Sequence, residues 1–258
     1  MVDDPTSPLH PAQQVDRPHI IRHPRTGTYV CWLKIMEPDG SQRSTVLTAP
    51  TLLGPYTIVR SWVRPLGMNA GDFDLVVDRT DGKAYYYFER VHSELICADL
   101  TDDYLDVTGY YSTHFPRQGP PLVREAPAYF RRGARHYLLT SGTTWYFPNP
   151  SEVAVADTYH GPWRVLDNPH PNDATGTSFR SQISSVFRHP QVDDLYIAIA
   201  DRWLPSWRPG DAEDYIADTA FADYVWLPLQ FEGDQPIINW RDEWRVEEFS
   251  RTDQKSSS

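Results

Sequence analysis

The chain has 258 residues, of which 40% are hydrophobic and 13% aromatic, so it can bury a sizeable core and is not expected to be disordered. Its formal net charge of −11 argues against nucleic acid and anionic membranes as partners. Only two cysteines occur, Cys31 and Cys97, both within apolar runs, which excludes a disulfide framework.

The N-terminal residues lack the basic and apolar regions of a signal peptide. No apolar run approaches the ~18 residues that a membrane helix needs. We therefore expect a soluble protein that is cytoplasmic, or secreted if a leader has been removed.

Short β-like runs separated by turn signals repeat four times along the chain. The repeats begin at residues 16, 72, 125 and 182, which are spaced 56, 53 and 57 residues apart. Each repeat has a first strand, a turn and a second strand that begins at Tyr29, Ala84, His136 or Leu195. A third strand follows at 45–48, 95–98, 153–156 or 224–227, and the segments 54–56 and 161–163 lead into a fourth.

Four antiparallel strands per repeat predict an all-β fold, a β-propeller of four-stranded blades. A β-sandwich with accidental spacing is the alternative. In a propeller the first strand of each blade lines the central channel, which places Asp16, Asp72, Glu125 and Gln182 at an equivalent register. Crowded carboxylates raise each other's pKa, and a neutral acid beside a second polar group is what glycoside hydrolysis requires. The alternative is that these four side chains only solvate the channel.

Several short strings, in order from about residue 16 to residue 249, resemble glycoside hydrolase family 43 and, within it, the exo-β-1,3-galactanase-like group. They are LTDDYLDVTG at 100–109, REAP at 124–127, TSG at 140–142 with PN at 148–149, SQ at 181–182, DRW at 201–203, YVWLPL at 224–229 and DEW at 242–244. The resemblance implies an inverting exo-glycosidase on a five-bladed propeller that acts on galactan-like β-linked glycans.

The resemblance also implies roles for individual residues. Glu125 falls on the general acid, and Gln182 falls on the glutamine that orients the water in this group. Asp72 falls on the aspartate that orients the acid and tunes its pKa, and Asp16 falls on a substrate-contacting glutamate that is one methylene longer. Four further residues fall on motifs that border the pocket, where a structural role is an equal alternative: Thr144, Asn149, Asp201 and Trp203.

The sequence departs from the pattern of this group in three places. Only 15 residues precede Asp16, too few for the additional first blade of relatives, so we expect four blades. Gly71 stands where the group has an arginine, and Arg180 stands where it has a glycine. We therefore expect weak or no hydrolysis of simple aryl glycosides, with binding of a carbohydrate or other small molecule retained. The alternatives are a non-catalytic glycan-binding propeller, and a family-43-like propeller recruited for acid-assisted cyclisation or isomerisation.

The remaining residues indicate no metal or other cofactor. The nine histidines have no metal-ligand spacing and are expected in turns and at strand edges, mostly solvated, although His19 could reach the channel. Trp203 and Trp207 lie on a long loop of the last blade, where a tryptophan either stacks on a sugar or covers the propeller edge. We expect an N-terminal extension at 1–15, one propeller domain at 16–249 and a disordered tail at 250–258; the sequence does not indicate an oligomeric state.

Overall fold

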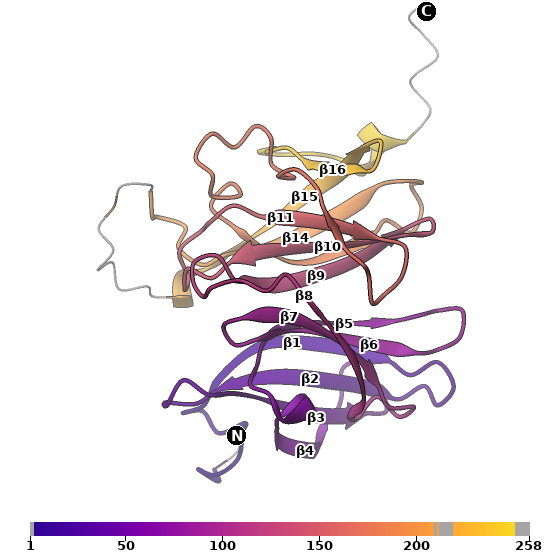
Figure 1. The fold of residues 1–258 in the computed structure, drawn as a ribbon, viewed down its shortest axis with the longest axis vertical. Helices are drawn as coiled ribbons and strands as arrows, with labels where there is room; N and C mark the ends of the chain where they lie inside the picture. The colour runs from indigo at the N-terminus through magenta and orange to yellow at the C-terminus, as the bar shows by residue number, and fades with distance from the viewer. Residues whose placement is uncertain (1–2, 209–210, 212–218, 251–258) are drawn as a thin grey trace, which may run out of the picture. The chain divides into compact units, whose positions relative to one another are not determined.

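The computed structural model describes residues 3–208, 211 and 219–250, and almost all of its regular structure is β-strand (Figure 1). Over these residues the helices are three short 3₁₀ turns, η1 (Pro65–Gly67), η2 (Thr219–Phe221) and η3 (Val246–Phe249). None of the helices in the described ranges has the length and apolar character needed to cross a membrane. The expected tail at 250–258 lies outside the described residues, apart from Ser250.

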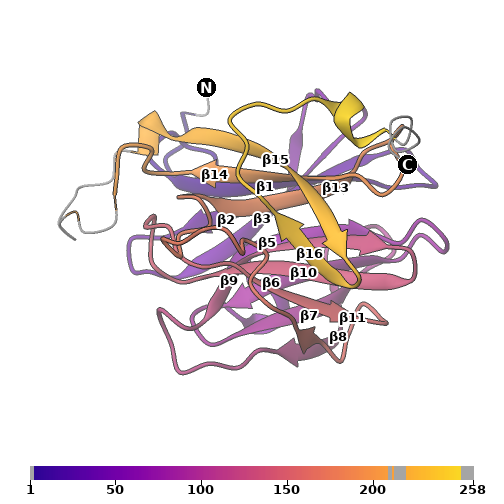
Figure 2. The same cartoon turned by 90° about the horizontal axis from the view of Figure 1, so that it is seen from above.

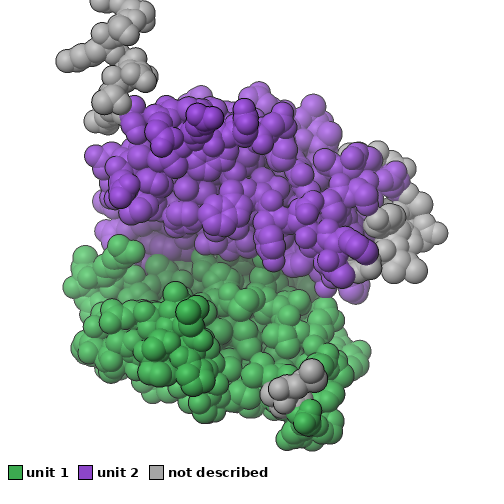
Figure 3. Space-filling model, turned by 180° about the vertical axis from the view of Figure 1, so that it is seen from behind, with its two compact units in different colours: residues 1–127 green, residues 128–258 purple. Residues whose placement is uncertain are grey.

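The chain divides into two compact units, Met1–Pro127 and Ala128–Ser258 (Figure 3). Unit 1 contains two four-stranded antiparallel sheets in which each strand pairs with the next in sequence. The first sheet consists of β1 (Gln14–Arg22), β2 (Tyr29–Met36), β3 (Gln42–Ala49) and β4 (Thr57–Val63). The second consists of β5 (Ala70–Val77), β6 (Ala84–Arg90), β7 (Glu94–Leu100) and β8 (Val107–His114).

Unit 2 repeats this arrangement, with β9 beginning just before the boundary between the units (Figure 2). Its first sheet consists of β9 (Arg124–Arg132), β10 (Arg135–Gly142), β11 (Glu152–Ala156) and β12 (Arg164–Val165). Its second consists of β13 (Gln182–Arg188), β14 (Tyr196–Arg202), β15 (Asp223–Glu232) and β16 (Gln235–Ile238). The prediction of an all-β fold built from four-stranded propeller blades is confirmed, and the blades begin where the repeat predicted them.

The first two blades turn between their first and second strands in the same way. In the first blade the His23 N–H donates to Thr28 O, and the Gly27 N–H donates to His23 O. In the second, the Asp78 N–H donates to Lys83 O, and the Gly82 N–H donates to Asp78 O. Gly27 has a φ of +75° and Gly82 a φ of +78°, a left-handed conformation that residues with a side chain seldom adopt. The turn therefore favours glycine at this position, and Gly27 and Gly82 recur at equivalent places in the first two repeats.

Aromatic residues form much of each core, which explains the aromatic surplus of the composition. In unit 1, Trp32, Tyr86 and Phe88 are fully buried, with ring centroids 4.9 Å apart for Trp32–Tyr86 and 4.8 Å apart for Tyr86–Phe88. In unit 2, Phe130 stacks on Tyr137 with centroids 5.0 Å apart. These rigid cores hold the first strand of each blade and, through it, the polar residues at its start.

The expectation of mostly solvated histidines is wrong for three of them. His23, His136 and His170 are buried. His23 Nε2 lies 2.8 Å from Asp102 O, and His136 Nδ1 lies 2.8 Å from the Tyr129 hydroxyl. Burial lowers the pKa of His170 to about 4, so this ring is neutral at pH 7. Each ring either meets a polar partner or stays uncharged, which is how a histidine enters a core.

Candidate active site

Asp72, at the start of β5, is held by two cations from the first blade. Nζ of Lys34, on β2, lies 2.7 Å from Asp72 Oδ1, and a guanidinium nitrogen of Arg17, on β1, lies 3.0 Å from Asp72 Oδ2. All three side chains are at most 10% exposed. The sequence analysis singled out Asp72 but neither cation.

These cations fix the charge of Asp72. Burial alone would raise the pKa of Asp72, but the positive charges of Arg17 and Lys34 outweigh burial and lower it below its ordinary value of 3.8. Burial likewise disfavours the Lys34 ammonium, but Asp72 and Asp16 raise the pKa of Lys34 above its ordinary value. At neutral pH both Asp72 and Lys34 are therefore ionised.

A β-bulge aims Arg17 at this carboxylate. The pairing of β1 with β2 shifts register between Asp16 and His19, and Arg17 takes a left-handed φ of +50° there. Asp16 is partly exposed, and its Oδ2 lies 3.4 Å from Lys34 Nζ. His19, which by the sequence analysis could reach the channel, has Nδ1 3.1 Å from Asp74 Oδ1. A bulge depends on pairing across strands, and the sequence carried no visible signal for it.

Glu125, the second residue of β9, carries the opposite pKa shift. Burial raises the pKa of Glu125 well above its ordinary value, and the negative charges of Asp72 and Glu89 raise it further, against the opposing effect of Arg17 and Lys34. Glu125 therefore keeps its proton at a pH where Asp72 has lost its own. One protonated and one ionised carboxyl group are the two states that acid catalysis at a glycosidic bond uses.

Glu89 is a third carboxyl group of this cluster and was missed by the sequence analysis. It lies near the end of β6 with a side chain only 2% exposed, and its Oε1 lies 2.6 Å from Nδ1 of His92, whose side chain is 39% exposed. Burial raises the pKa of Glu89, and the hydrogen bond to Glu89 raises the pKa of His92. The available signal was a glutamate that directly follows the buried apolar run Ala84–Phe88.

Gln182, the first residue of β13, lies in unit 2 and is held at both ends of its amide. Its Nε2 donates to Ser141 Oγ at 2.8 Å, and its Oε1 accepts from Nε1 of Trp203 at 3.0 Å. The Trp203 ring lies 5.4 Å from that of Tyr146, centroid to centroid. Gln182 and Trp203 line one small pocket of unit 2, together with Tyr146 and Asp201. Asp201 pairs with Gln182 across β13 and β14.

Thr144 and Asn149 shape the loop beside this pocket. The Asn149 side chain exchanges hydrogen bonds with both backbone groups of Gly142, at 2.6 and 2.8 Å, and donates to Thr144 Oγ1 at 2.7 Å. Thr144 Oγ1 in turn donates to Phe147 O at 2.6 Å. These contacts give both residues a structural role in holding the loop that carries Tyr146.

Arg180 belongs to a strained segment that leads into Gln182. Ser178, Phe179 and Arg180 have φ values of +52°, +58° and +60°, a left-handed conformation that non-glycine residues seldom adopt in succession. The Arg180 guanidinium donates to Pro205 O at 3.0 Å and to Trp207 O at 3.4 Å. Arg180 thereby holds the loop on which Trp203 lies through side-chain hydrogen bonds, which a glycine at this position could not form.

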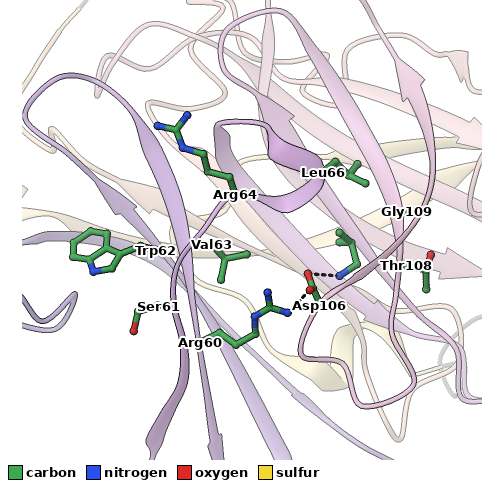
Figure 4. Close-up of a pocket in the computed structure, with 10 residues that line it drawn as sticks. Arg60, Ser61, Trp62, Val63, Arg64, Leu66, Asp106, Thr108 and Gly109 are labelled. Carbon is green, nitrogen blue, oxygen red and sulfur yellow. Dashed lines mark hydrogen bonds and ion pairs between the residues drawn. The ribbon is translucent and has the colours of Figure 1, made fainter.

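A larger groove of about 640 Å³ lies between β4 and β8 in unit 1 and contains none of these residues (Figure 4). Arg60 and Asp106 form an ion pair across it. Its two strands each pair with only one neighbour in their sheets. The polar cluster around Asp72 in unit 1 and the polar cluster around Gln182 in unit 2 are the candidate functional clusters, each described within its own unit. No group of three or more histidine, cysteine or acidic side chains placed to hold a metal ion occurs within the described ranges.

Comparison with known proteins decides the family. The sequence pattern of Glycosyl hydrolases family 43 matches residues 18–198, more than half of the chain. The chain belongs to this family. That membership confirms the resemblance seen in the sequence and the assignment to the glycoside hydrolase class.

Individual relatives are consistent with this family. A GH43 β-1,3-galactosidase solved with galactodeoxynojirimycin is 26% identical, with a TM-score of 0.81 over 95% of this chain and 80% of its own. A second GH43 β-1,3-galactosidase is 29% identical, with a TM-score of 0.79 over 92% of this chain and 47% of its own. A β-xylosidase of Bacillus subtilis (strain 168) is 24% identical over 73% of this chain. The chain spans 36% of the xylosidase and about half of the second galactosidase.

Proposed function

We propose that this family 43 protein is an exo-acting glycoside hydrolase that releases galactose from β-1,3-linked, galactan-like glycans, with Glu125 as general acid. One observation carries the proposal: the surroundings of the two carboxyl groups move their pKa values apart, raising the pKa of Glu125 and lowering that of Asp72. Two relatives that match most of this chain are named as β-1,3-galactosidases, which favours galactose over xylose.

In this reaction the Glu125 carboxyl group protonates the glycosidic oxygen as the bond to the sugar C1 breaks. The fixed negative charge of Asp72 disfavours loss of that proton before substrate binds. Water attacks C1 from the opposite face, which inverts the anomeric configuration. A glutamine amide is essentially non-basic, so we assign Gln182 to orienting this water, whose excess proton passes to solvent. Glu125 then regains a proton from solvent.

Binding of a glycan without cleavage is the second candidate. It is favoured by the Gln182 amide, whose oxygen and nitrogen already bond to Trp203 and Ser141. A glutamine engaged at both ends has less capacity to direct water. This candidate predicts affinity for galactan oligosaccharides without release of galactose.

The proposal is tested by incubating the purified chain with β-1,3-galactan and following the products by proton NMR from the first minutes. We expect galactose whose first-formed anomer is α, since inversion of a β-linkage gives the α-anomer. A β-anomer formed first would contradict inversion. Binding with no galactose over many hours would instead support the second candidate.

A further inference from the structure

An aromatic groove, distinct from the small pocket at Gln182, occupies the outer part of the last blade in unit 2. Its volume is about 460 Å³, within the range of about 300–1,000 Å³ typical of ligand sites. We define it by the residues Arg202, Asp223, Tyr224, Trp226, Trp240 and Trp244. Tyr224 is 73% exposed and Trp226 is 54% exposed. Exposed aromatic rings gathered in one groove mark a binding surface more often than chance.

The strand pattern of β15 creates this surface. Tyr224 and Trp226 alternate with the buried residues Val225 and Leu227, so the two rings lie on one face of the strand. Val225 and Leu227 therefore pack in the core, and the rings of Tyr224 and Trp226 lie on the exposed face. An ordinary solvent-facing strand would place polar side chains at these positions.

Hydrogen bonds fix the two tryptophans that complete the groove. Nε1 of Trp244 donates to Trp226 O at 2.8 Å, and Nε1 of Trp240 donates to Asp242 Oδ1 at 2.8 Å. The Arg202 guanidinium carbon lies 4.8 Å from the centroid of the Trp240 ring. Rings that are already oriented lose little conformational entropy when a ligand stacks on them.

The chemistry of the groove matches a neutral glycan. The C–H face of a pyranose ring is apolar and slightly positive, which complements the negative face of an aromatic ring. The exposed side chains of Asp223, Asp242 and Glu243 lie around these rings and provide acceptors for sugar hydroxyl groups. The same carboxylates, with the chain's net charge of −11, disfavour nucleic acid.

The groove and the pocket at Gln182 lie at the same end of the last blade. Gln182 pairs with Asp201 on β14, and Asp201 pairs with Tyr224 on β15. Trp203, which bonds to Gln182, directly follows Arg202 of the groove. The strand ends therefore lead in register from the pocket to the exposed rings.

We propose that the aromatic groove binds the sugar units of a β-linked glycan that lie beyond the unit being cleaved. This inference rests on the proposed hydrolase function and adds to it a preference for longer chains. The occupant is a neutral oligosaccharide, stacked on Tyr224 and Trp226, while its terminal sugar lies at Gln182.

The test compares β-1,3-galactooligosaccharides of two and five units as substrates for the wild type, Tyr224→Ala and Trp226→Ala. We expect KM for the pentasaccharide to be lower than for the disaccharide in the wild type, and to rise about 2- to 10-fold in each variant. KM for the disaccharide should rise less than KM for the pentasaccharide, because the disaccharide places only one sugar unit beyond the cleaved one, and kcat for both substrates should stay unchanged. Tyr110→Ala is the matched control, because Tyr110 is 64% exposed on β8 in the other unit.

The two proposals fail in different ways. If neither oligosaccharide is hydrolysed by the wild type, the proposed function is wrong; binding of the pentasaccharide, measured by calorimetry with the same variants, then still tests the groove. If KM and affinity do not depend on chain length, or the groove variants behave like Tyr110→Ala, the groove does not bind glycan. Sedimentation that shows wild-type dimers lost in Trp226→Ala would make the groove a protein interface and overturn the inference.

Discussion

Gly71 and Glu89 depend on each other: a Cβ atom at position 71 would lie 2.3 Å from Oε2 of Glu89. The Glu89 carboxyl group therefore occupies space that any other residue at position 71 would fill. Gly71 directly precedes Asp72 on β5, so this packing brings a third carboxyl group to the Asp72 cluster. The glycine that departs from the group's sequence pattern is thus matched by a glutamate on the neighbouring strand.

Gly71→Ala should lower the free energy of unfolding by about 1–3 kcal/mol, because the added methyl group overpacks a buried site. The measurement is urea denaturation monitored by tryptophan fluorescence. In the Glu89→Ala background, Gly71→Ala should cost much less than in the wild type, because the carboxyl group that the added methyl group would meet is gone. Additive losses in the double variant would show that the two residues are not coupled.

Glu89→Gln should move the alkaline limb of the pH profile of kcat/KM to lower pH. The negative charge of Glu89 raises the pKa of Glu125, so its removal lets Glu125 lose its proton earlier as pH rises. His92, Asp72 and Lys34 also face Glu89 and remain in the variant. Glu94→Gln, on the neighbouring strand β7, is the control and should leave the limb in place. A shift to higher pH in Glu89→Gln would refute the assigned electrostatic effect.

Lys34→Met should destabilise the fold by about 3–5 kcal/mol at pH 7, since it leaves the buried Asp72 carboxylate with one cation fewer. The lowered pKa of Asp72 means that its ion pairing stabilises the fold above pH 3.8, and that this contribution is lost as pH falls toward the folded-state pKa. The raised pKa of Lys34 makes its contribution complete below pH 10.5, so pH 7 lies within both windows. Lys83→Met, at an exposed turn, should change stability by less than about 0.5 kcal/mol. Equal losses in the two variants would contradict this account.

Trp203→Phe should reduce kcat by about tenfold, corresponding to about 1.4 kcal/mol, because Gln182 Oε1 loses its indole donor and the amide is held less firmly. Trp207→Phe is the matched control: the buried Nε1 of Trp207 has no hydrogen-bond partner among the described residues. Steady-state kinetics on β-1,3-galactan measures both. A control that loses as much activity as Trp203→Phe would place the effect in loop packing.

The repeat and the blade starts were predictable because alternation, turn glycines and spacing are local properties of the sequence. The carboxyl groups Asp72 and Glu125 were found in the same way, from their equivalent register. The cations were not, because Arg17 reaches Asp72 through a bulge and Lys34 does so from an adjacent sheet within unit 1. Burial of Glu89 depends on the missing side chain of Gly71, a contact between strands that no single segment encodes.

For the candidate residues of unit 2, too, the sequence indicated positions but not the contacts that each side chain makes. The resemblance indicated Thr144 and Asn149 as neighbours of a pocket, and their hydrogen bonds place them in the supporting loop. The aromatic groove could have been predicted from the sequence, since Tyr224 and Trp226 alternate with apolar residues. What the sequence could not decide is which side of the strand is buried, because both sets of side chains are hydrophobic.

The most direct test of this account is the rate of galactose release from β-1,3-galactan by Glu125→Gln, with circular dichroism to confirm that the variant is folded. Glutamine has nearly the same shape but no acidic proton, so we expect kcat to fall about 10²- to 10⁴-fold. Glu232→Gln, an exposed glutamate at the end of β15, should keep the wild-type rate. A folded Glu125→Gln variant that releases galactose at the wild-type rate would show that Glu125 is not the general acid.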